Sequence, residues 1–404
     1  MKQIKPVTSQ PVEYPVTWKQ VAAFRLSRHH LVERAPATKL VSVVGDMAGA
    51  QAQLLSAAQT SIWARVRDLH IAQVEKAMSK RTLVKAACMR QTLFLVPARD
   101  LAIFVRGTSG RAEKEIRWAL GKGVPERVID AAIDAALSSL DEPLVRAEIA
   151  ERTSRILGVT RRDVQGGGWG SHRQLAAVPV GELIYPVVDL LHLVAARGVV
   201  CYGPNRGNEP TFVRADAWIP NWKDMPREQA EEHLLQRYLR TFGPATVTDF
   251  AIWSGVTLRD AQQIWTRKQS GFATVNVEGW RTQVLRQDLE DLAMADLKRP
   301  VIRLLPYFDT FLLGHKERDH LVAIENKPSV YRAQGWIAPV VLVNGRVVGV
   351  WEHTRSGDHL QVKVQKFTPL SRASVSGIQE EVRDLGRFLG SPNVDVQIQG
   401  EESV

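Results

Sequence analysis

The residues whose types and spacing could carry chemistry are two glutamines, Gln51 and Gln53, separated by one alanine shortly before an expected helix. A glutamine amide donates and accepts hydrogen bonds without carrying a charge, so such a pair could position a water molecule as a neutral acceptor. Paired glutamines near the start of a helix are also common as solvated or capping groups. The pair by itself is compatible with both roles.

Other residues suggest metal or phosphate chemistry, but their spacing argues against it. His315 and His320 have no third clustered ligand, which favours surface or hydrogen-bonded histidines. The glycine-rich segment 166–170 lacks the Lys-Ser/Thr ending of a phosphate loop and any expected preceding strand, which favours a loop. Cys88 and Cys201 lie far apart and are interpreted as small core residues. We therefore predict neither a metal nor a cofactor.

Composition favours a chain of several domains that binds a polyanion. The 404 residues, 45% of them hydrophobic, are enough for two to four domains with substantial cores. Lys and Arg number 53 against 43 Asp and Glu, which gives a net charge of +10 and an isoelectric point near 9.7. Basic solvated surfaces are common, so charge alone does not establish nucleic-acid binding.

Targeting and membrane segments are not recognisable in the sequence. Residues 1–15 contain no apolar core of the signal-peptide type, and no apolar run is long enough to span a membrane. We expect a cytoplasmic, nucleoid-associated protein with no membrane partner.

The first part of the chain has a pattern of helices followed by a hairpin. Apolar spacing predicts helices over residues 17–35, 40–48, 54–69 and 71–79. Two strands follow at residues 83–88 and 92–96 and end before Pro97. Helices followed by a two-stranded hairpin are typical of a winged helix, a variant of the helix-turn-helix.

The same order returns twice. Helices over residues 125–140 and 143–157, with helical spacing over 171–194, precede strands at 198–202 and 211–213. Helices over residues 229–240, 246–255 and 257–268 precede strands at 273–277 and 281–284, with Thr257 as an expected N-cap.

The last part of the chain is mostly β. Short β runs lie at residues 301–305, 340–343, 347–351 and 361–364, with a hairpin turn at Asn344-Gly345 and a closing helix over 373–389. We predict an α+β fold of three tandem winged-helix units, residues 1–110, 111–225 and 226–290, and a C-terminal β-rich domain over 291–404.

Several ordered segments resemble the AlkZ-like DNA glycosylases. The glutamine pair lies within Gly49-Ala50-Gln51-Ala52-Gln53, followed by Ile62-Trp63-Ala64-Arg65. Similar segments occur at the first hairpin, in the third unit and near the C-terminus: residues 89–97, 237–255, 305–318 and 338–351. The resemblance covers nearly the whole chain.

The resemblance implies a fold, an activity and a partner. The three units and the β region would form a C shape around a cationic channel, and Gln51 and Gln53 would be the catalytic pair. Glutamine rather than aspartate at position 53 is similar to the branch associated with bulky alkyl adducts and interstrand cross-links. The expected protein is a monomeric, monofunctional glycosylase acting on double-stranded DNA that contains alkylated bases.

The implied chemistry suits amides. A purine alkylated at N7 or N3 already carries positive charge, so the base leaves without a strong general acid. The enzyme then has to stabilise an oxocarbenium-like sugar and position a water molecule, which a glutamine carbonyl can do. An aspartate would add general-base capacity, which only less labile bases would need.

Residues within the family-like segments are the candidates for DNA contact. The basic candidates for phosphate contact are Arg65, Lys85, Arg90, Lys316 and Arg318. The first hairpin departs from the family pattern, in which glycine stands in place of Gln91 and histidine in place of Phe94. Phe94 either packs in the core of the hairpin or stacks against a sugar or base of the DNA.

A second interpretation belongs to another class of protein. Winged-helix repeats would serve a non-catalytic DNA-binding protein, a regulator or an adduct-binding shield, equally well. Only the glutamine pair in its segment distinguishes the enzyme from this alternative.

Overall fold

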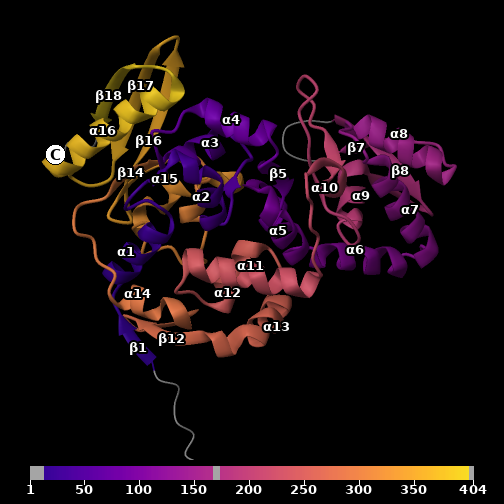
Figure 1. Cartoon of the computed structure of the whole chain (residues 1–404), viewed down its shortest axis with the longest axis horizontal. Helices are drawn as coiled ribbons and strands as arrows, with labels where there is room; N and C mark the ends of the chain where they lie inside the picture. The colour runs from indigo at the N-terminus through magenta and orange to yellow at the C-terminus, as the bar shows by residue number, and fades with distance from the viewer. Residues whose placement is uncertain (1–12, 167–172, 400–404) are drawn as a thin grey trace, which may run out of the picture.

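The computed structural model describes residues 13–166 and 173–399 of the chain. Figure 1 shows the N-terminal elements in indigo near the centre, with a C-terminal sheet in yellow on one side and the middle of the chain in magenta on the other. The fold is mixed α+β. No helix in the described ranges is both long and apolar enough to cross a membrane.

The N-terminal part contains the predicted helices and hairpin, with shorter helices. Its elements are β1 (Glu13–Val16), α1 (Trp18–Arg28), β2 (Ala35–Pro36), α2 (Leu40–Asp46), β3 (Ala50–Gln51), α3 (Leu55–Trp63), β4 (Val66–Arg67), α4 (Ile71–Ser79), β5 (Leu83–Ala87), the 3₁₀ turn η2 (Met89–Gln91) and β6 (Leu93–Pro97). The helix predicted over 17–35 ends early because His30 adopts a φ of 55° and the Leu31 amide donates to the Leu26 carbonyl.

The middle part departs most from prediction. Its elements are α5 (Leu101–Gly107), α6 (Gly110–Gly121), α7 (Glu126–Ser139), α8 (Arg146–Leu157), β7 (Arg162–Gly166), β8 (Arg173–Val180), β9 (Leu183–Pro186), α9 (Val187–Val194), β10 (Val200–Tyr202), β11 (Phe212–Arg214) and α10 (Ala215–Trp218). Helical spacing over 171–194 is wrong for residues 173–186, which form a hairpin.

Two residues explain that difference. Pro179 would remove an amide from a helix, whereas here it lies in a strand. Gly181, with a φ of 61°, allows the tight turn that pairs Val180 with Leu183. Strand β7 also precedes the glycine-rich segment, contrary to prediction, and residues 167–170 of that segment lie outside the described residues.

The remaining elements confirm the predicted order. They are α11 (Arg227–Phe242), α12 (Val247–Ser254), α13 (Leu258–Lys268), β12 (Phe272–Val277), β13 (Trp280–Leu285), α14 (Leu289–Ala293), β14 (Ile302–Leu305), α15 (Lys327–Val330), β15 (Val340–Val343), β16 (Arg346–Ser356), β17 (His359–Lys366), α16 (Arg372–Leu389) and β18 (Asn393–Gln399). Thr257 caps α13, as predicted, by accepting from the Asp260 amide. Strand β18 was not predicted and pairs in parallel with β17.

One pattern of pairing occurs three times. In each case a helix leads to a short extended segment, two further helices and an antiparallel hairpin, and the short segment pairs with the second hairpin strand. The three pairings are Gln51 with Phe94, Leu144 with Phe212, and Ala245 with Gln283.

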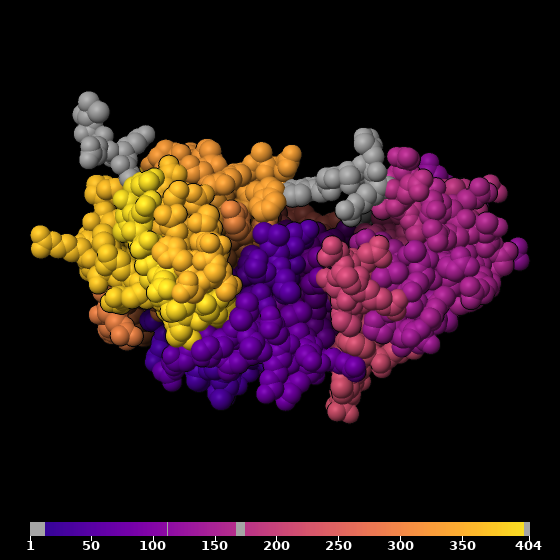
Figure 2. All heavy atoms as spheres, turned by 90° about the horizontal axis from the view of Figure 1, so that it is seen from above, coloured from indigo at the N-terminus to yellow at the C-terminus, as the bar shows by residue number. Residues whose placement is uncertain are grey.

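The three repeats are not structurally separate. Tyr202 of β10 pairs with Lys85 of β5, so two hairpins share one sheet in the order β11-β10-β5-β6-β3. Strand β1 pairs with β12, which lies in the third repeat. One buried cluster joins the N-terminal Trp63 to Trp351 and Phe388 of the C-terminal part, and Figure 2 shows the N-terminal residues lying between the C-terminal and middle parts. The boundaries between the four predicted domains stay a prediction.

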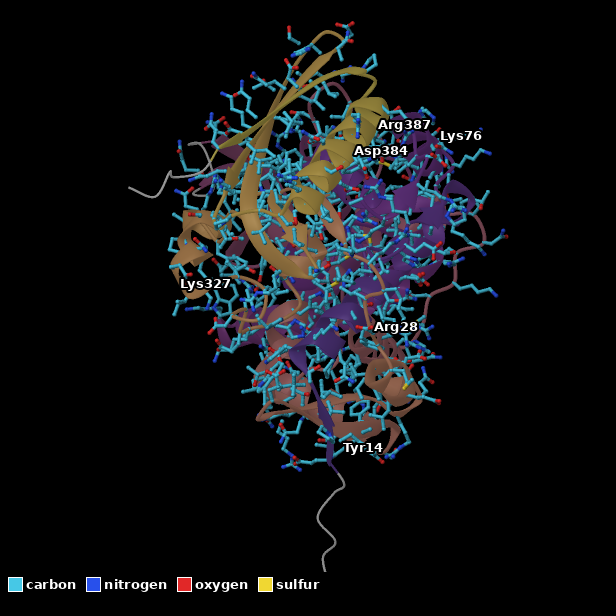
Figure 3. All side chains as sticks on the ribbon, turned by 90° about the vertical axis from the view of Figure 1, so that its left-hand side faces the viewer. Tyr14, Arg28, Lys76, Lys327, Asp384 and Arg387 are labelled. Atoms are coloured by element: carbon cyan, nitrogen blue, oxygen red, sulfur yellow. The ribbon has the colours of Figure 1, made fainter. Side chains whose placement is uncertain are left out.

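Polar contacts attach α3 to the C-terminal part. Arg65 forms two 2.8 Å hydrogen bonds with Asp309, and both side chains of this ion pair are fully buried. The Trp63 indole donates to Asp384 of α16 at 2.9 Å. In Figure 3, Asp384 and Arg387 lie on the side of α16 that borders the N-terminal helices, where Arg387 donates to the Leu69 carbonyl.

We predict that Asp309→Ala lowers the free energy of unfolding by about 3–5 kcal/mol, because it leaves the Arg65 guanidinium buried without its counter-charge. Urea denaturation measures this loss. The double variant Arg65→Met/Asp309→Leu should recover most of it, since no uncompensated charge remains. Removing Glu142 from its exposed pair with Arg152 is the control and should leave the midpoint nearly unchanged.

Candidate active site

Strand β3 fixes Gln51 against the hairpin. Gln51 pairs with Phe94 of β6, and the next amide, from Ala52, donates to the Leu93 carbonyl at 2.6 Å. Ala52 is buried, Gln51 is only 7% exposed, and Gln53 is exposed. The segment therefore holds Gln51 rigidly and presents Gln53 to solvent beside it.

A left-handed turn leads from α2 into β3. Ala48 has a φ of 58° and Gly49 a φ of 90°. A Cβ atom at position 49 would lie 3.1 Å from the Val96 side chain and 3.2 Å from that of Phe94. Both the positive φ and this close approach favour glycine, which accounts physically for the first residue of the family-like segment.

Arg90 is the direct partner of Gln51. Its Nη2 donates to the Gln51 Oε1 at 3.0 Å and its Nη1 donates to the Trp253 carbonyl at 2.6 Å. Burial, and then the nearby Arg318, lower the pKa of Arg90 to about 10, so the group is still a cation at neutral pH. Because a guanidinium only donates, the Gln51 amide oxygen must face Arg90 and its NH₂ group is left for other partners.

The position of Arg90 depends on a glycine in another repeat. Arg90 lies in η2 with a φ of 53°, next to the end of α12. A Cβ atom at Gly255, which has a φ of 81°, would lie 2.7 Å from the Arg90 Cα. A side chain there would push the turn away from α12 and, with it, the guanidinium that holds Gln51.

The surface beside Gln53 is apolar and rich in free amides. Leu54 and Leu55 are 36% and 39% exposed, unusual for leucines. Leu54 is the N-cap of α3, and no side chain caps this helix end. First-turn amides without partners and two exposed leucines offer donors and an apolar edge to a ligand at this surface.

Arg318 and Lys316 lie on the segment after β14. Arg318 packs 4.3 Å over the Tyr331 ring and donates to the His315 carbonyl at 3.1 Å. Lys316 is exposed, and its nearest carboxylate is that of Glu317 at 3.8 Å. Among the described residues, neither Arg90 nor Arg318 forms an ion pair. Two guanidinium groups without counter-charges therefore lie near Gln51.

Lys85 occupies a different place. It lies on β5, partly buried, with its Nζ 4.8 Å from the centre of the Tyr202 ring. Burial lowers its pKa. Its ammonium group thus packs at the seam where the first two hairpins pair, and its contact with DNA stays a prediction.

Two predicted DNA contacts are wrong in this structure. Arg65 is fully buried, and its guanidinium binds Asp309 and Ser61, so it cannot reach a phosphate. Phe94 is 1% exposed and lies in the core shared by the hairpin and α11–α12, which confirms the packing alternative and excludes stacking on a base. Arg65 and Phe94 therefore contribute to the stability of the fold.

His315 and His320 pack against other parts of the protein. His315 is buried, and burial holds its pKa well below the usual value. His320 stacks on Trp18 and contacts the Arg25 Nη1 at 2.8 Å, while burial and Arg25 lower its pKa to about 2. No group of three or more potential metal ligands occurs among the described residues.

The contacts to Trp253 and Gly255 were missed in the sequence. Both residues lie within a family-like segment of the third repeat. Their spacing along the chain gave no reason to expect a contact with Arg90. Only the packing of η2 against α12 brings residues 90 and 255 together.

The comparisons with known proteins agree on one family. The family model described as DNA glycosylase AlkZ-like matches residues 44–388, which include both glutamines and all the predicted DNA contacts. The chain is 32% identical over 396 residues to an interstrand DNA cross-link repair glycosylase from Streptomyces sahachiroi, covering 95% of this chain and 99% of the relative. The solved structure of Streptomyces sahachiroi DNA glycosylase AlkZ superposes with a TM-score of 0.75 at 27% identity and covers 95% of this chain and 100% of that one.

The contacts of Arg90 predict a positioning role. Arg90→Lys keeps the positive charge but cannot span from the Trp253 carbonyl to the Gln51 amide, so Gln51 loses its fixed orientation. We expect the rate constant for base release to fall about 100-fold, with the dissociation constant for DNA little changed. Single-turnover kinetics and equilibrium binding measure the two quantities.

The control for this variant is Arg299→Lys, an exposed arginine between α14 and β14. A parallel loss of binding and turnover in Arg90→Lys would instead identify Arg90 as a DNA contact and contradict the positioning role.

Proposed function

This chain belongs to the AlkZ-like DNA glycosylase family, and from that premise we propose that it hydrolyses the N-glycosidic bond of purines alkylated at N7 or N3 and leaves an abasic site. Family membership favours an enzyme over the non-catalytic alternative. The observation that carries the proposal is the pair Gln51 and Gln53, one amide fixed by Arg90 and the next exposed beside it.

The arrangement supports different roles for the two amides. As the C1′–N9 bond breaks, its electron pair neutralises the cationic base and the sugar becomes oxocarbenium-like. A water molecule then forms a bond to C1′ through its oxygen and releases its extra proton to the solvent. The Gln53 carbonyl accepts a hydrogen bond from this water, while the Gln51 NH₂ group donates to the substrate. Neither amide changes charge, which suits a base that leaves readily.

The proposal extends to the substrate and the fold. The relative from Streptomyces sahachiroi is named for interstrand cross-link repair, and the glutamine at position 53 supports the same class of bulky adduct here. The threefold pairing pattern supports three winged-helix units within residues 1–110, 111–225 and 226–290, and a β-rich domain over 291–404, around a cationic channel. The proposed partner is double-stranded DNA bound by a monomer.

The direct test uses two duplexes, one with a single N7-methylguanine and one with an interstrand cross-link. Release of the base leaves an alkali-labile site, which appears as a strand break after alkali treatment. Retained binding without base release from either duplex would contradict the proposed activity. Release from the first duplex alone would restrict the activity to monoadducts.

Substitution of the glutamines tests their roles. We expect Gln51→Ala and Gln53→Ala each to lower the single-turnover rate by about 10- to 1000-fold, the scale of losing an orienting hydrogen bond. DNA binding should change little, because neither amide is charged. The control is Gln397→Ala on β18, an exposed glutamine at the far edge of a sheet. Equal losses of DNA affinity and rate would show a structural role for the pair.

The unpaired guanidinium of Arg318 predicts a salt effect. If it neutralises one phosphate, Arg318→Gln should reduce the slope of log K against log salt concentration by about 0.9. Fluorescence anisotropy with an undamaged duplex at several salt concentrations measures the slope, with Arg299→Gln as the control. A binding constant independent of salt in the unsubstituted protein would argue against a cationic channel.

A further inference from the structure

A second basic cavity lies at the end of the β5–β6 hairpin remote from Gln51. Its volume is about 600 Å³, and it lies between the end of α4, the two hairpin strands and the segment after α10. The lining residues are Val41, Lys80, Arg81, Thr82, Ala98, Arg99, Ile219, Pro220, Asn221, Trp222 and Lys223. Four of them are cations and none is a carboxylate.

The charges of this cavity are not neutralised by the protein. None of the ion pairs formed within the described ranges includes Lys80, Arg81, Arg99 or Lys223. Lys80 is the C-cap residue of α4, where a cation suits the helix dipole, but that role does not account for the other three. Like charges gathered around one hollow repel each other, so an anion bound there would relieve the repulsion.

In a larger basic hollow, several of the cations do form ion pairs with carboxylates. It has a volume of about 860 Å³ and lies beside α11 and α13. Its Arg237 pairs with Asp100, and Arg267 and Lys268 pair with glutamates of α11. Its other two cations, Arg240 and Arg286, form no ion pair among the described residues. Because all four cations of the smaller cavity lack an ion pair, that cavity is the better anion site.

Part of the cavity is rigidly preorganised. Arg81 packs 3.7 Å over the Trp218 ring and donates to the Trp218 carbonyl at 3.1 Å. Its φ is 58° and that of Asn221 is 54°, so two non-glycine residues in left-handed conformations line the same cavity.

The rest of the lining is apolar and aromatic. Trp222 is partly exposed at the cavity, beside Ile219, Pro220 and Val41. An aromatic ring next to several cations is the combination that binds single-stranded nucleic acid, in which bases stack and phosphates contact basic groups. A simple inorganic anion would not need the aromatic surface.

We propose that this cavity is a second nucleic-acid site, which takes an unpaired stretch of DNA with its phosphates on Lys80, Arg99 and Lys223 and a base on Trp222. The site is separate from the candidate active site. Gln51 lies opposite Phe94, and the cavity begins at Ala98, about 13 Å further along the chain at 3.3 Å per residue. The inference does not depend on the proposed glycosidic chemistry.

Binding of a short oligothymidylate to the full chain tests the proposal. The triple variant Lys80→Gln/Arg99→Gln/Lys223→Gln should weaken binding at least about tenfold at low salt. The matched control is Lys114→Gln/Lys298→Gln/Arg299→Gln, which removes the same charge from exposed positions elsewhere. Equal weakening by both triples would show a net-charge effect and overturn the site.

Trp222→Leu separates a nucleic-acid strand from a simple polyanion. We expect it to weaken binding of the oligothymidylate but not of inorganic polyphosphate. If it weakens neither, the aromatic surface has no role and the nucleic-acid assignment is wrong.

Photo-crosslinking supplies a local readout that does not depend on affinity. An oligothymidylate containing 5-bromodeoxyuridine should form an adduct at Trp222, located by mass spectrometry, and should do so equally in the Gln51→Ala variant. Adducts confined to residues next to Gln53 would overturn the proposal while leaving the proposed enzymatic function intact.

Discussion

The buried ion pair between Arg65 and Asp309 is the constraint on which the N-terminal half of the site depends. Two charges removed from water are stable only when each satisfies the other, so the distance between α3 and the segment after β14 is fixed closely. Helix α3 begins at Leu55, two residues after Gln53. Its C-terminal attachment, through Arg65 and Trp63, therefore determines where its N-terminal end and the exposed amide lie.

A second constraint acts at the other glutamine. Gln51 is fixed by backbone pairing with Phe94 and by the guanidinium of Arg90, which is itself held by the end of α12. The site therefore uses the first repeat for its amides, the third for the support of Arg90, and the C-terminal part for the attachment of α3. A change in the packing between these parts would alter the geometry of the amides without touching them.

The sequence was sufficient for features that depend on local pattern. The hairpin at residues 83–97, the cap at Thr257 and the turn at Asn344-Gly345 follow from alternation, side-chain capping and backbone preference. The sequence was insufficient where contacts between distant parts of the chain determine whether a side chain is buried or exposed. Arg65 looks like a surface cation until Asp309, distant in sequence, is placed beside it. Phe94 looks like a possible stacking residue until the fold places it in the buried cluster that it shares with residues of α11 and α12.

The net charge, too, can be read from the sequence, whereas the place where a charged partner binds depends on the structure. A net charge of +10 indicates a polyanionic partner but cannot say where it binds, because exposed arginines lie in many parts of the chain, among them Arg67, Arg259 and Arg355. More informative are groups of neighbouring cations that form no ion pair among the described residues. They occur at both ends of the β5–β6 hairpin, Arg90 and Arg318 at the Gln51 end and Lys80, Arg81 and Arg99 at the other. The β5–β6 hairpin thus separates two basic surfaces that could bind anions. Binding at one surface would therefore leave the other surface accessible.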